Sequence, residues 1–397
     1  MNKLTRRTAL GAALASPFIS RRSNAATSIK IGMPLALTGP LGIVGEQMRR
    51  GALLWQKTVN AQGGLIGRPI ELLISDTGGD PATCVRKAQE CVERDGCRIL
   101  FGMTLSSEAL AVVPKLAEWE SVFISSDNGD GRLTGESLVP NFFRANISGP
   151  MGARAVSLYL RDAPFKGFYA IGMDYAWGRN SVEVFQGEMK RANKNFIGAV
   201  FSPTGTKDFS TYITKIRQSG ADALYLVLAG DDYGAFLAQA KQYRLGDKVQ
   251  LLTEVVDMAV MRSVGDAGVG LIGSTRYSAA IDTAMNRDFV ALWTKEYGNA
   301  PDNNEGDQWQ ACQVLGDAIT RAGSADIEPL KAALLTVNMD SIKGHIAMRE
   351  CDHQVIQPGF MVKVVKQAGS AVPGAEVLAT FPGEKTAPAC RQMTYTD

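Results

Sequence analysis

The chain has 397 residues, with 42 Lys and Arg against 40 Asp and Glu, so its formal net charge at pH 7 is +2. It has two histidines, which supply few ligands for a zinc site and few groups for proton transfer near neutral pH. No cluster of Lys and Arg beyond residue 25 could neutralise a phosphate backbone, so we expect no nucleic-acid partner.

The first 25 residues have the form of a cleaved export signal. Arg6 and Arg7 precede a short uncharged run at residues 8–20, and small residues end the segment at Ala25. A basic start, an apolar middle and a small-residue exit are typical of secretion signals, and paired arginines are typical of the twin-arginine route. A disordered basic tail is the alternative. We therefore expect a periplasmic mature protein; removing five basic and no acidic residues lowers the net charge from +2 to −3.

The first part of the mature chain alternates predicted strands and helices. Strands are expected at residues 29–34, 70–76, 98–101 and 122–125, and helices at residues 45–60, 82–94 and 107–119. Asp80 and Pro81 supply an N-cap and a first-turn proline for the second helix. This order predicts a parallel sheet with helices on both faces.

The pattern restarts after residues 142–149 and predicts a second sheet of the same kind. Its strands are expected at residues 167–172, 196–201, 223–228 and 250–253, and its helices at residues 150–160, 178–192, 209–219 and 233–243. The strand at 270–277 can return the chain to the first sheet. We therefore expect the helices at 286–297, 305–322 and 327–337 to pack beside that sheet. A strand at 359–366 precedes a Pro/Gly-rich tail. We predict an α/β protein of two doubly wound parallel-sheet lobes, with a ligand cleft between them.

Common catalytic and nucleotide-binding motifs are absent or stand in the wrong context. Residues 268–273 match G-x-G-x-x-G, but a strand is expected after this segment instead of before it, which indicates a tight turn. There is no G-x-x-x-x-G-K-S/T loop, no G-x-S-x-G elbow and no H-E-x-x-H. The pattern favours binding over catalysis, and we expect no enzyme activity, no cofactor and no metal.

Three loops of the first lobe follow predicted strands and suit a small polar ligand. They hold Val44 (residues 38–45), Ser106 and Ser107 (residues 102–107) and Asn128 (residues 125–129). Hydroxyls and free N–H groups ahead of a helix suit a carboxylate. Either serine could also simply cap that helix.

Loops of the second lobe offer aromatic rings and acids at the matching edge. Tyr175 is favoured as a ring that contacts ligand, whereas Trp177 could equally pack in the core. Asp231, Asp232 or Glu254 could pair with an ammonium group, although the two aspartates could instead cap a helix.

Six cysteines could form disulfides in an oxidising compartment, but an even count does not fix the pairing. Cys84 and Cys91 lie about 10 Å apart along one predicted helix, too far for a bridge. Cys351 and Cys390 both lie in the C-terminal portion, and they are the pair we expect.

Several segments spread over the mature chain match one family pattern. They are residues 31–35, 38–40, 60–67, 106–107, 174–179, 202–210, 219–223 and 351–354. Together they resemble the extracytoplasmic substrate-binding proteins of ABC transporters, of the leucine/isoleucine/valine-binding protein-like family with the type I periplasmic binding fold. The similarity is specific for the family and not for one ligand.

The resemblance implies two lobes hinged by three crossings, which we place near residues 144–148, 276–278 and 353–358. The first lobe would then hold residues 27–145 plus 278–353, and the second residues 146–277 plus 354–397. Ser106 and the Asn128 region would hold a ligand carboxylate, and the second lobe would close over it through Tyr175 and the regions of Gly230 and Glu254.

The implied function is capture of a branched-chain or hydrophobic amino acid, or of a related small organic acid that includes aromatic ones. Family members often carry aromatic residues at the positions of Val44 and Gly230, so the cavity is expected to be reshaped here. Glu254 and Asp257 are the candidates for an ammonium-binding acid. A monomer that delivers its ligand to the permease subunits is expected; an extracytoplasmic sensor that uses the same fold without transport is the alternative.

Overall fold

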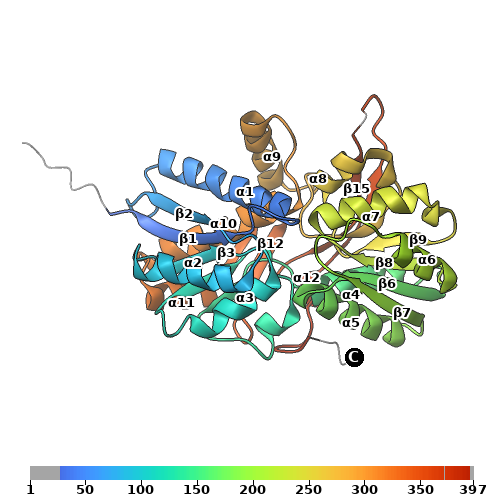
Figure 1. The fold of residues 1–397 in the computed structure, drawn as a ribbon. Helices are drawn as coiled ribbons and strands as arrows, with labels where there is room; N and C mark the ends of the chain where they lie inside the picture. The colour runs from blue at the N-terminus through green and yellow to red at the C-terminus, as the bar shows by residue number, and fades with distance from the viewer. Residues whose placement is uncertain (1–26, 371, 394–397) are drawn as a thin grey trace, which may run out of the picture.

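The computed structural model describes residues 27–370 and 372–393 (Figure 1). The export signal predicted at residues 1–25 lies outside the described residues and stays a prediction. Within the described part of the chain, no helix is long and apolar enough to cross a membrane. Two sheets, each flanked by helices, form two lobes that lie side by side.

The first lobe is built on an eight-stranded sheet in the order β11-β12-β13-β5-β4-β3-β1-β2. Strands β1 to β5 pair in parallel, as the alternation of strands and helices predicts. The antiparallel hairpin of β11 and β12 was not predicted and extends the sheet beyond β13. The strands are β1 (Ile29–Leu35), β2 (Ile70–Asp76), β3 (Ile99–Gly102), β4 (Val122–Ser125), β5 (Phe142–Arg144), β11 (Asn338–Ser341), β12 (Gly344–Arg349) and β13 (Gln354–Ile356).

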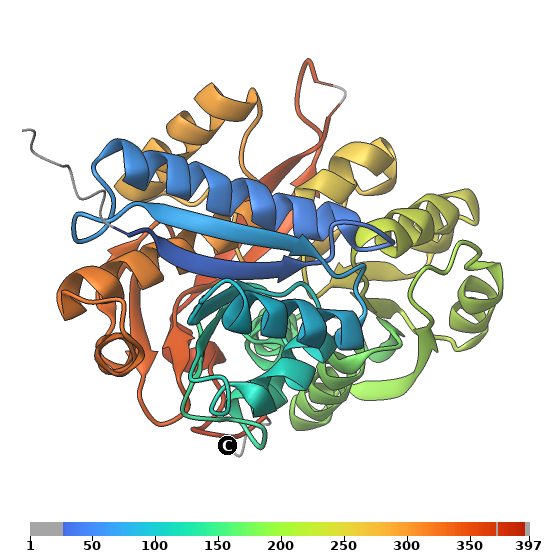
Figure 2. The ribbon, with the colours of Figure 1, turned by 60° about the vertical axis from the view of Figure 1, so that its left-hand side comes forward.

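Helices cover both faces of this sheet because its central strands are apolar on both sides. Phe101 packs on the side of α1, whereas its neighbour Leu100 packs against α2 and α3. Figure 2 shows α1 above strands β1 and β2 and the teal helices α2 and α3 below them. The helices are α1 (Gly42–Ala61), α2 (Pro81–Glu93), α3 (Ser106–Val112), α9 (Ala284–Tyr297), α10 (Asn303–Ala322) and α11 (Ile327–Leu335), with the 3-10 turns η1 (Val113–Lys115) and η2 (Gly131–Thr134).

The second lobe is built on a seven-stranded sheet in the order β15-β14-β10-β9-β8-β6-β7. Helix α4 packs against α5 and α7 packs against α8, on opposite sides of the sheet (Figure 1). The strands are β6 (Gly167–Met173), β7 (Asn195–Ser202), β8 (Ala223–Val227), β9 (Gln250–Thr253), β10 (Ile272–Thr275), β14 (Gly359–Val365) and β15 (Gly374–Phe381). The helices are α4 (Gly149–Leu160), α5 (Ala176–Arg191), α6 (Ser210–Gln218), α7 (Gly230–Gln242), α8 (Met258–Val264) and α12 (Gly383–Thr386), with the 3-10 turns η3 (Leu245–Asp247) and η4 (Gly265–Ala267).

One predicted helix is too long, and one strand in the tail was not predicted. The helix predicted at residues 107–119 ends at Val112 and continues as the 3-10 turn η1, because Pro114 has no N–H to donate to the helix. The Pro/Gly-rich tail contains the strand β15, which was not predicted and which pairs antiparallel with β14. Residues 268–273 lead from η4 into β10, so the glycine motif is the helix-to-strand turn that its context predicted.

The chain passes between the two sheets three times, after β5, after β10 and after β13. Strand β13 pairs with β5 in the first sheet, although residues from 354 onwards were expected in the second lobe. We therefore propose that the third lobe boundary follows Ile356, and we keep the rest of the division as a proposal. The expected disulfide between Cys351 and Cys390 is present, with a Cα–Cα distance of 6.2 Å.

Candidate functional site

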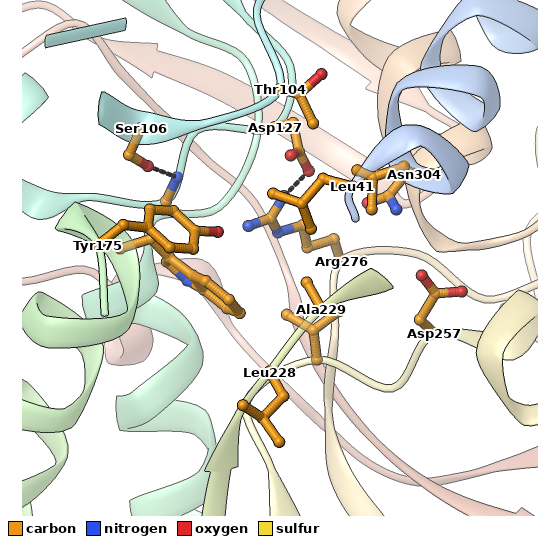
Figure 3. Close-up of a pocket in the computed structure, with 14 residues that line it drawn as sticks. Leu41, Thr104, Ser106, Asp127, Tyr175, Leu228, Ala229, Asp257, Arg276 and Asn304 are labelled. Atoms are coloured by element: carbon orange, nitrogen blue, oxygen red, sulfur yellow. Dashed lines mark hydrogen bonds and ion pairs between the residues drawn. The ribbon is translucent and has the colours of Figure 1, made fainter. Parts of the chain in front are cut away.

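A cavity opens between the lobes at the carboxyl ends of the strands (Figure 3). Its interior volume is about 40 Å³, and about 490 Å³ is free of protein atoms when the open space at its mouth is included. The first lobe lines it with residues from three strand-end loops, α1 and α10: Leu41, Val44, Thr104, Ser106, Asp127, Gly129 and Asn304. The second lobe and the second crossing supply Tyr175, Trp177, Leu228, Ala229, Val255, Asp257 and Arg276.

The lobes touch each other around this cavity. Helix α3 packs against α5, and α1 packs against α7. The backbone N–H of Asp231 donates to the carbonyl of Pro40 at 3.0 Å, and the N–H of Gly131 donates to Asn180 Oδ1 at 2.9 Å. The described conformation is therefore a closed one.

Arg276 places a buried guanidinium in the middle of the cavity. Its Nη1 donates to Asp127 Oδ1, and its backbone N–H donates to Asn303 Oδ1 at 2.9 Å. Burial raises the pKa of Asp127 to about 6 while the charge of Arg276 opposes this rise. The carboxylate is thus ionised and paired at pH 7. Asp127 is the one side chain among the described residues that accepts from the guanidinium, which leaves further N–H donors for a ligand.

Ser106 begins α3, and its hydroxyl is turned away from the helix backbone. Its Oγ accepts the N–H groups of Gly129 and Asp130, both at 3.1 Å. With two bonds accepted, the hydroxyl keeps its own proton for donation, and the group lies on the cavity wall. The helix is capped instead at Leu105, with Glu108 accepting the Leu105 N–H at 2.9 Å, so the expected serine cap is wrong.

A polar group closes the opposite end of the cavity. Asp257 Oδ1 accepts the N–H of Ala259 at 2.9 Å and Gln47 Nε2 at 3.4 Å. Gln47 Oε1 in turn accepts from Asn304 Nδ2 at 2.7 Å. Burial, followed by the nearby charge of Asp302, raises the pKa of Asp257 to about 7. This carboxyl can therefore be present in either protonation state at neutral pH.

An aromatic wall stands on the side of the second lobe. The rings of Tyr175 and Trp177 lie 5.9 Å apart, and both line the cavity. The indole Nε1 of Trp177 donates to Glu254 Oε1 at 2.8 Å, and the hydroxyl of Tyr225 donates to Oε2 at 3.2 Å. Burial raises the pKa of Glu254 to about 7. Trp177 therefore serves both as cavity wall and as a partner for a buried acid.

The structure places the predicted site residues in two groups. Val44, Ser106 and Tyr175 line the cavity, and Ser107, Asn128, Gly230 and Glu254 do not. Ser107 is partly buried beside the cavity wall.

Each of the other three residues supports the cavity from behind. Asn128 Nδ2 donates to the carbonyl of Met103 at 3.0 Å and so joins two loops of the first lobe. Glu254 lies behind Trp177. Gly230 meets Pro40 at the lobe contact, next to the lining residues Leu228 and Ala229.

Two acids that were considered for an ammonium group have other partners. The carboxylate of Asp232 accepts the N–H groups of Gly205 and Thr206, and Asp231 pairs with Lys207 at 3.4 Å. Neither caps α7, whose N-cap is Ala229. The residues that the sequence reasoning missed are Asp127 and Arg276. Asp127 lies in the loop at residues 125–129, which was already predicted to line the site. Arg276 could have been predicted as well, because it is a charged residue directly after the buried strand β10.

The family model described as "Periplasmic binding protein" matches residues 28–371. The chain belongs to this family. Within it, the leucine/isoleucine/valine-binding-like relationship that the sequence motifs indicated is confirmed.

A curated relative and two solved structures illustrate this membership. The Leu-, Ile-, Val-, Thr- and Ala-binding protein of Pseudomonas aeruginosa is 25% identical, over 88% of this chain and 94% of that protein. An ABC transporter substrate-binding protein from Sphaerobacter thermophilus has a TM-score of 0.81 at 27% identity, covering 90% of this chain and 98% of the other. A solute-binding protein from Rhodopseudomonas palustris, solved with 3,4-dihydroxybenzoic acid, has a TM-score of 0.83 at 23% identity, with the same coverage of 90% and 98%.

Among the described residues, one group has the spacing of metal ligands: Cys351, Asp352 and Cys390. The two sulfurs are joined in the disulfide, so they are not free to bind a metal as thiolates.

Proposed function

We propose that this periplasmic binding protein captures a small hydrophobic solute with a carboxylate group between its lobes. The observation that carries the proposal is the pair of free donors in the closed cavity, the Arg276 guanidinium and the Ser106 hydroxyl. A guanidinium binds a carboxylate through two parallel hydrogen bonds, and such charge-assisted bonds are about twice as strong as neutral ones.

The walls of the cavity support a hydrophobic body for the ligand. Leu41, Val44, Leu228 and Val255 contribute aliphatic surface, and Tyr175 contributes a ring. Apolar walls with a few placed polar groups are typical of small-molecule sites. The P. aeruginosa relative is named for aliphatic amino acids and the R. palustris structure holds an aromatic acid, so both ligand classes belong in the test.

The charge of the cavity favours an acid without an ammonium group. Asp127 is neutralised by Arg276, which leaves Asp257 as the acid available for an ammonium. Burial raises the pKa of Asp257, which disfavours the charged form that an ammonium needs, and a protonated carboxyl can instead donate to a ligand hydroxyl.

We further propose that the closed, loaded form docks on the permease subunits of an ABC importer and releases its ligand there. Closure depends on a ligand that binds the closed state better than the open one, which requires contacts from both lobes. The Ser106 hydroxyl of the first lobe, the Arg276 guanidinium of the second crossing and the rings of the second lobe meet this requirement. Export by the predicted signal and a monomeric state complete the proposal.

A thermal-shift screen followed by calorimetry tests it. Aromatic acids, aliphatic carboxylic acids, aliphatic amino acids and amides are compared, because a ligand of the folded state raises its stability by mass action. Ser106→Ala should weaken the best ligand by about 1–3 kcal/mol, roughly 5- to 150-fold. Unchanged affinity would remove Ser106 from the site, and preference for amides over acids would overturn the carboxylate assignment.

A further inference from the structure

Cys91 and Cys97 bring two thiols together near the amino ends of strands β1 and β3. This end of the first sheet is the one away from the ligand cavity. Cys91 lies in the last turn of α2, and Cys97 comes two residues before β3. The N–H of Cys97 donates to the carbonyl of Cys91 at 3.0 Å. This bond keeps the two α-carbons within about 7 Å, the longest span that a disulfide bridges.

The two side chains also point to one place. A β-carbon added at Gly32 of β1 would stand 2.6 Å from Cys91 Sγ and 3.3 Å from Cys97 Sγ. Because Gly32 has no side chain, both sulfurs fit against the strand there. The hydrogen bond between the thiols lowers the pKa of Cys91 and raises the pKa of Cys97.

The remaining thiols lack such a neighbour. Cys84 and Cys312 are buried and form no disulfide, and desolvation is the largest cause of the raised pKa of each thiol. Cys91 and Cys97 are also buried, but the turn between them is exposed at Glu93, Arg94 and Gly96. An oxidant can therefore reach this pair through a small local opening of the turn.

We propose that Cys91 and Cys97 form a second disulfide in the mature protein once it is exported. The oxidant is another disulfide, of a dithiol protein or a small molecule, in a compartment where disulfides persist. The Cys91 thiolate attacks it to give a mixed disulfide, and the Cys97 thiolate then displaces the oxidant's sulfur from Cys91. The two electrons and two protons end on the oxidant as two thiols, and the chain gains one S–S bond.

Tryptic mapping tests the pair directly. The exported protein is unfolded with an alkylating agent and without reductant, and then digested. Cleavage after Lys87, Arg94 and Arg98 separates Cys91 from Cys97, so the two peptides stay together only if a disulfide joins them. We expect the linked species, lighter than its two parts by two hydrogens and lost on reduction, while Cys84 and Cys312 are alkylated. Alkylated Cys91 and Cys97 in the exported protein would overturn the proposal.

Two further samples identify the bond and its cause. The same chain produced without the signal in a reducing cytoplasm should yield alkylated Cys91 and Cys97. In an exported Cys91→Ser variant, Cys97 should be alkylated; a link from Cys97 to Cys84 or Cys312 would contradict the assigned pairing. As a matched control, the double variant Cys84→Ser with Cys312→Ser should leave the linked peptides unchanged. The double variant Cys91→Ser with Cys97→Ser should have a lower melting temperature than the oxidised wild-type protein, because it lacks the disulfide. None of these results depends on ligand binding.

Discussion

A β-carbon added at Gly230 would stand 2.3 Å from the carbonyl oxygen of Pro40 on the opposite lobe. The same oxygen accepts the N–H of Asp231 at 3.0 Å, so backbone meets backbone at this point. Gly230 also has a φ of +58°, which favours glycine. The size of residue 230 therefore limits how far the lobes close.

Gly230→Ala should weaken ligand binding at least tenfold, or about 1.4 kcal/mol, because the added methyl group opposes the closed state that binds ligand. Gly220→Ala is the matched control: its φ is +75°, yet its added β-carbon meets nothing within 4 Å. Calorimetry measures affinity, and small-angle scattering measures the compaction caused by ligand. Equal affinities of the two variants would show that this contact does not govern closure.

Arg276→Gln should lose both stability and ligand affinity. Removing the guanidinium leaves the buried Asp127 without its partner, which costs about 3–5 kcal/mol for pairs of this kind. Adding Asp127→Asn removes the stranded charge, so the double variant should recover stability and still fail to bind a carboxylate ligand. Denaturant unfolding and calorimetry separate the two effects. Recovery of binding along with stability would show that Arg276 acts only on the fold.

The exposed ion pair of Arg287 and Asp282 supplies the matched control for the Arg276 and Asp127 variants. Their side chains are 64% and 91% exposed, so replacing them by Gln and Asn should change stability by less than about 1 kcal/mol. Ligand affinity should not change, since neither residue lines the cavity.

The parallel parts of the fold were predictable because their signals are local. Apolar strands such as β3 alternate with capped helices such as α2, and Asp80 accepts the Thr83 N–H at 2.7 Å as its position predicted. The antiparallel edge strands were not predictable in the same way. β11, β12 and β15 are half-exposed and polar in part, so they lack the continuous apolar run that marks a buried strand, although each pairs with a strand nearby in the chain.

The loops of the site were predictable, and the contacts within them were not. Topology brings strand ends to one edge, which placed Ser106 and Tyr175 at the cavity. The pairing of Arg276 with Asp127 joins residues 149 positions apart, and no local pattern encodes it. Likewise, Glu254 follows a strand end as expected but turns behind Trp177, because a buried acid needs donors and the indole supplies one.

Glu254→Gln should alter how stability depends on pH. Burial raises the pKa of Glu254 from 4.5 to about 7, so the folded state binds more protons than the unfolded state between these values. Wild-type stability therefore falls as pH rises through this window, by up to about 3 kcal/mol from this group. The variant should gain that amount relative to wild type between pH 4.5 and 8 in denaturant unfolding. Glu120→Gln, at an 80% exposed side chain, should show no such gain, and parallel curves for Glu254→Gln would place its pKa near the ordinary value.

The titration of Asp257 makes the pH dependence of affinity a test of the ligand's charge. Its pKa of about 7 lies between the values of ligand carboxyl and ammonium groups, so Asp257 changes charge between pH 6 and 8 while the ligand does not. An acid without an ammonium prefers the protonated carboxyl, and its affinity should fall roughly tenfold over this range. An amino acid prefers the ionised carboxyl, and its affinity should rise instead. Calorimetry compares the pH dependence of affinity in wild type with that in Asp257→Asn. Titration of the neighbouring Asp302 and Glu305 affects both proteins, so it cancels in the comparison. We expect the falling profile, flattened in the variant; a rising profile would assign an ammonium-bearing ligand and contradict the preference argued from the cavity charge.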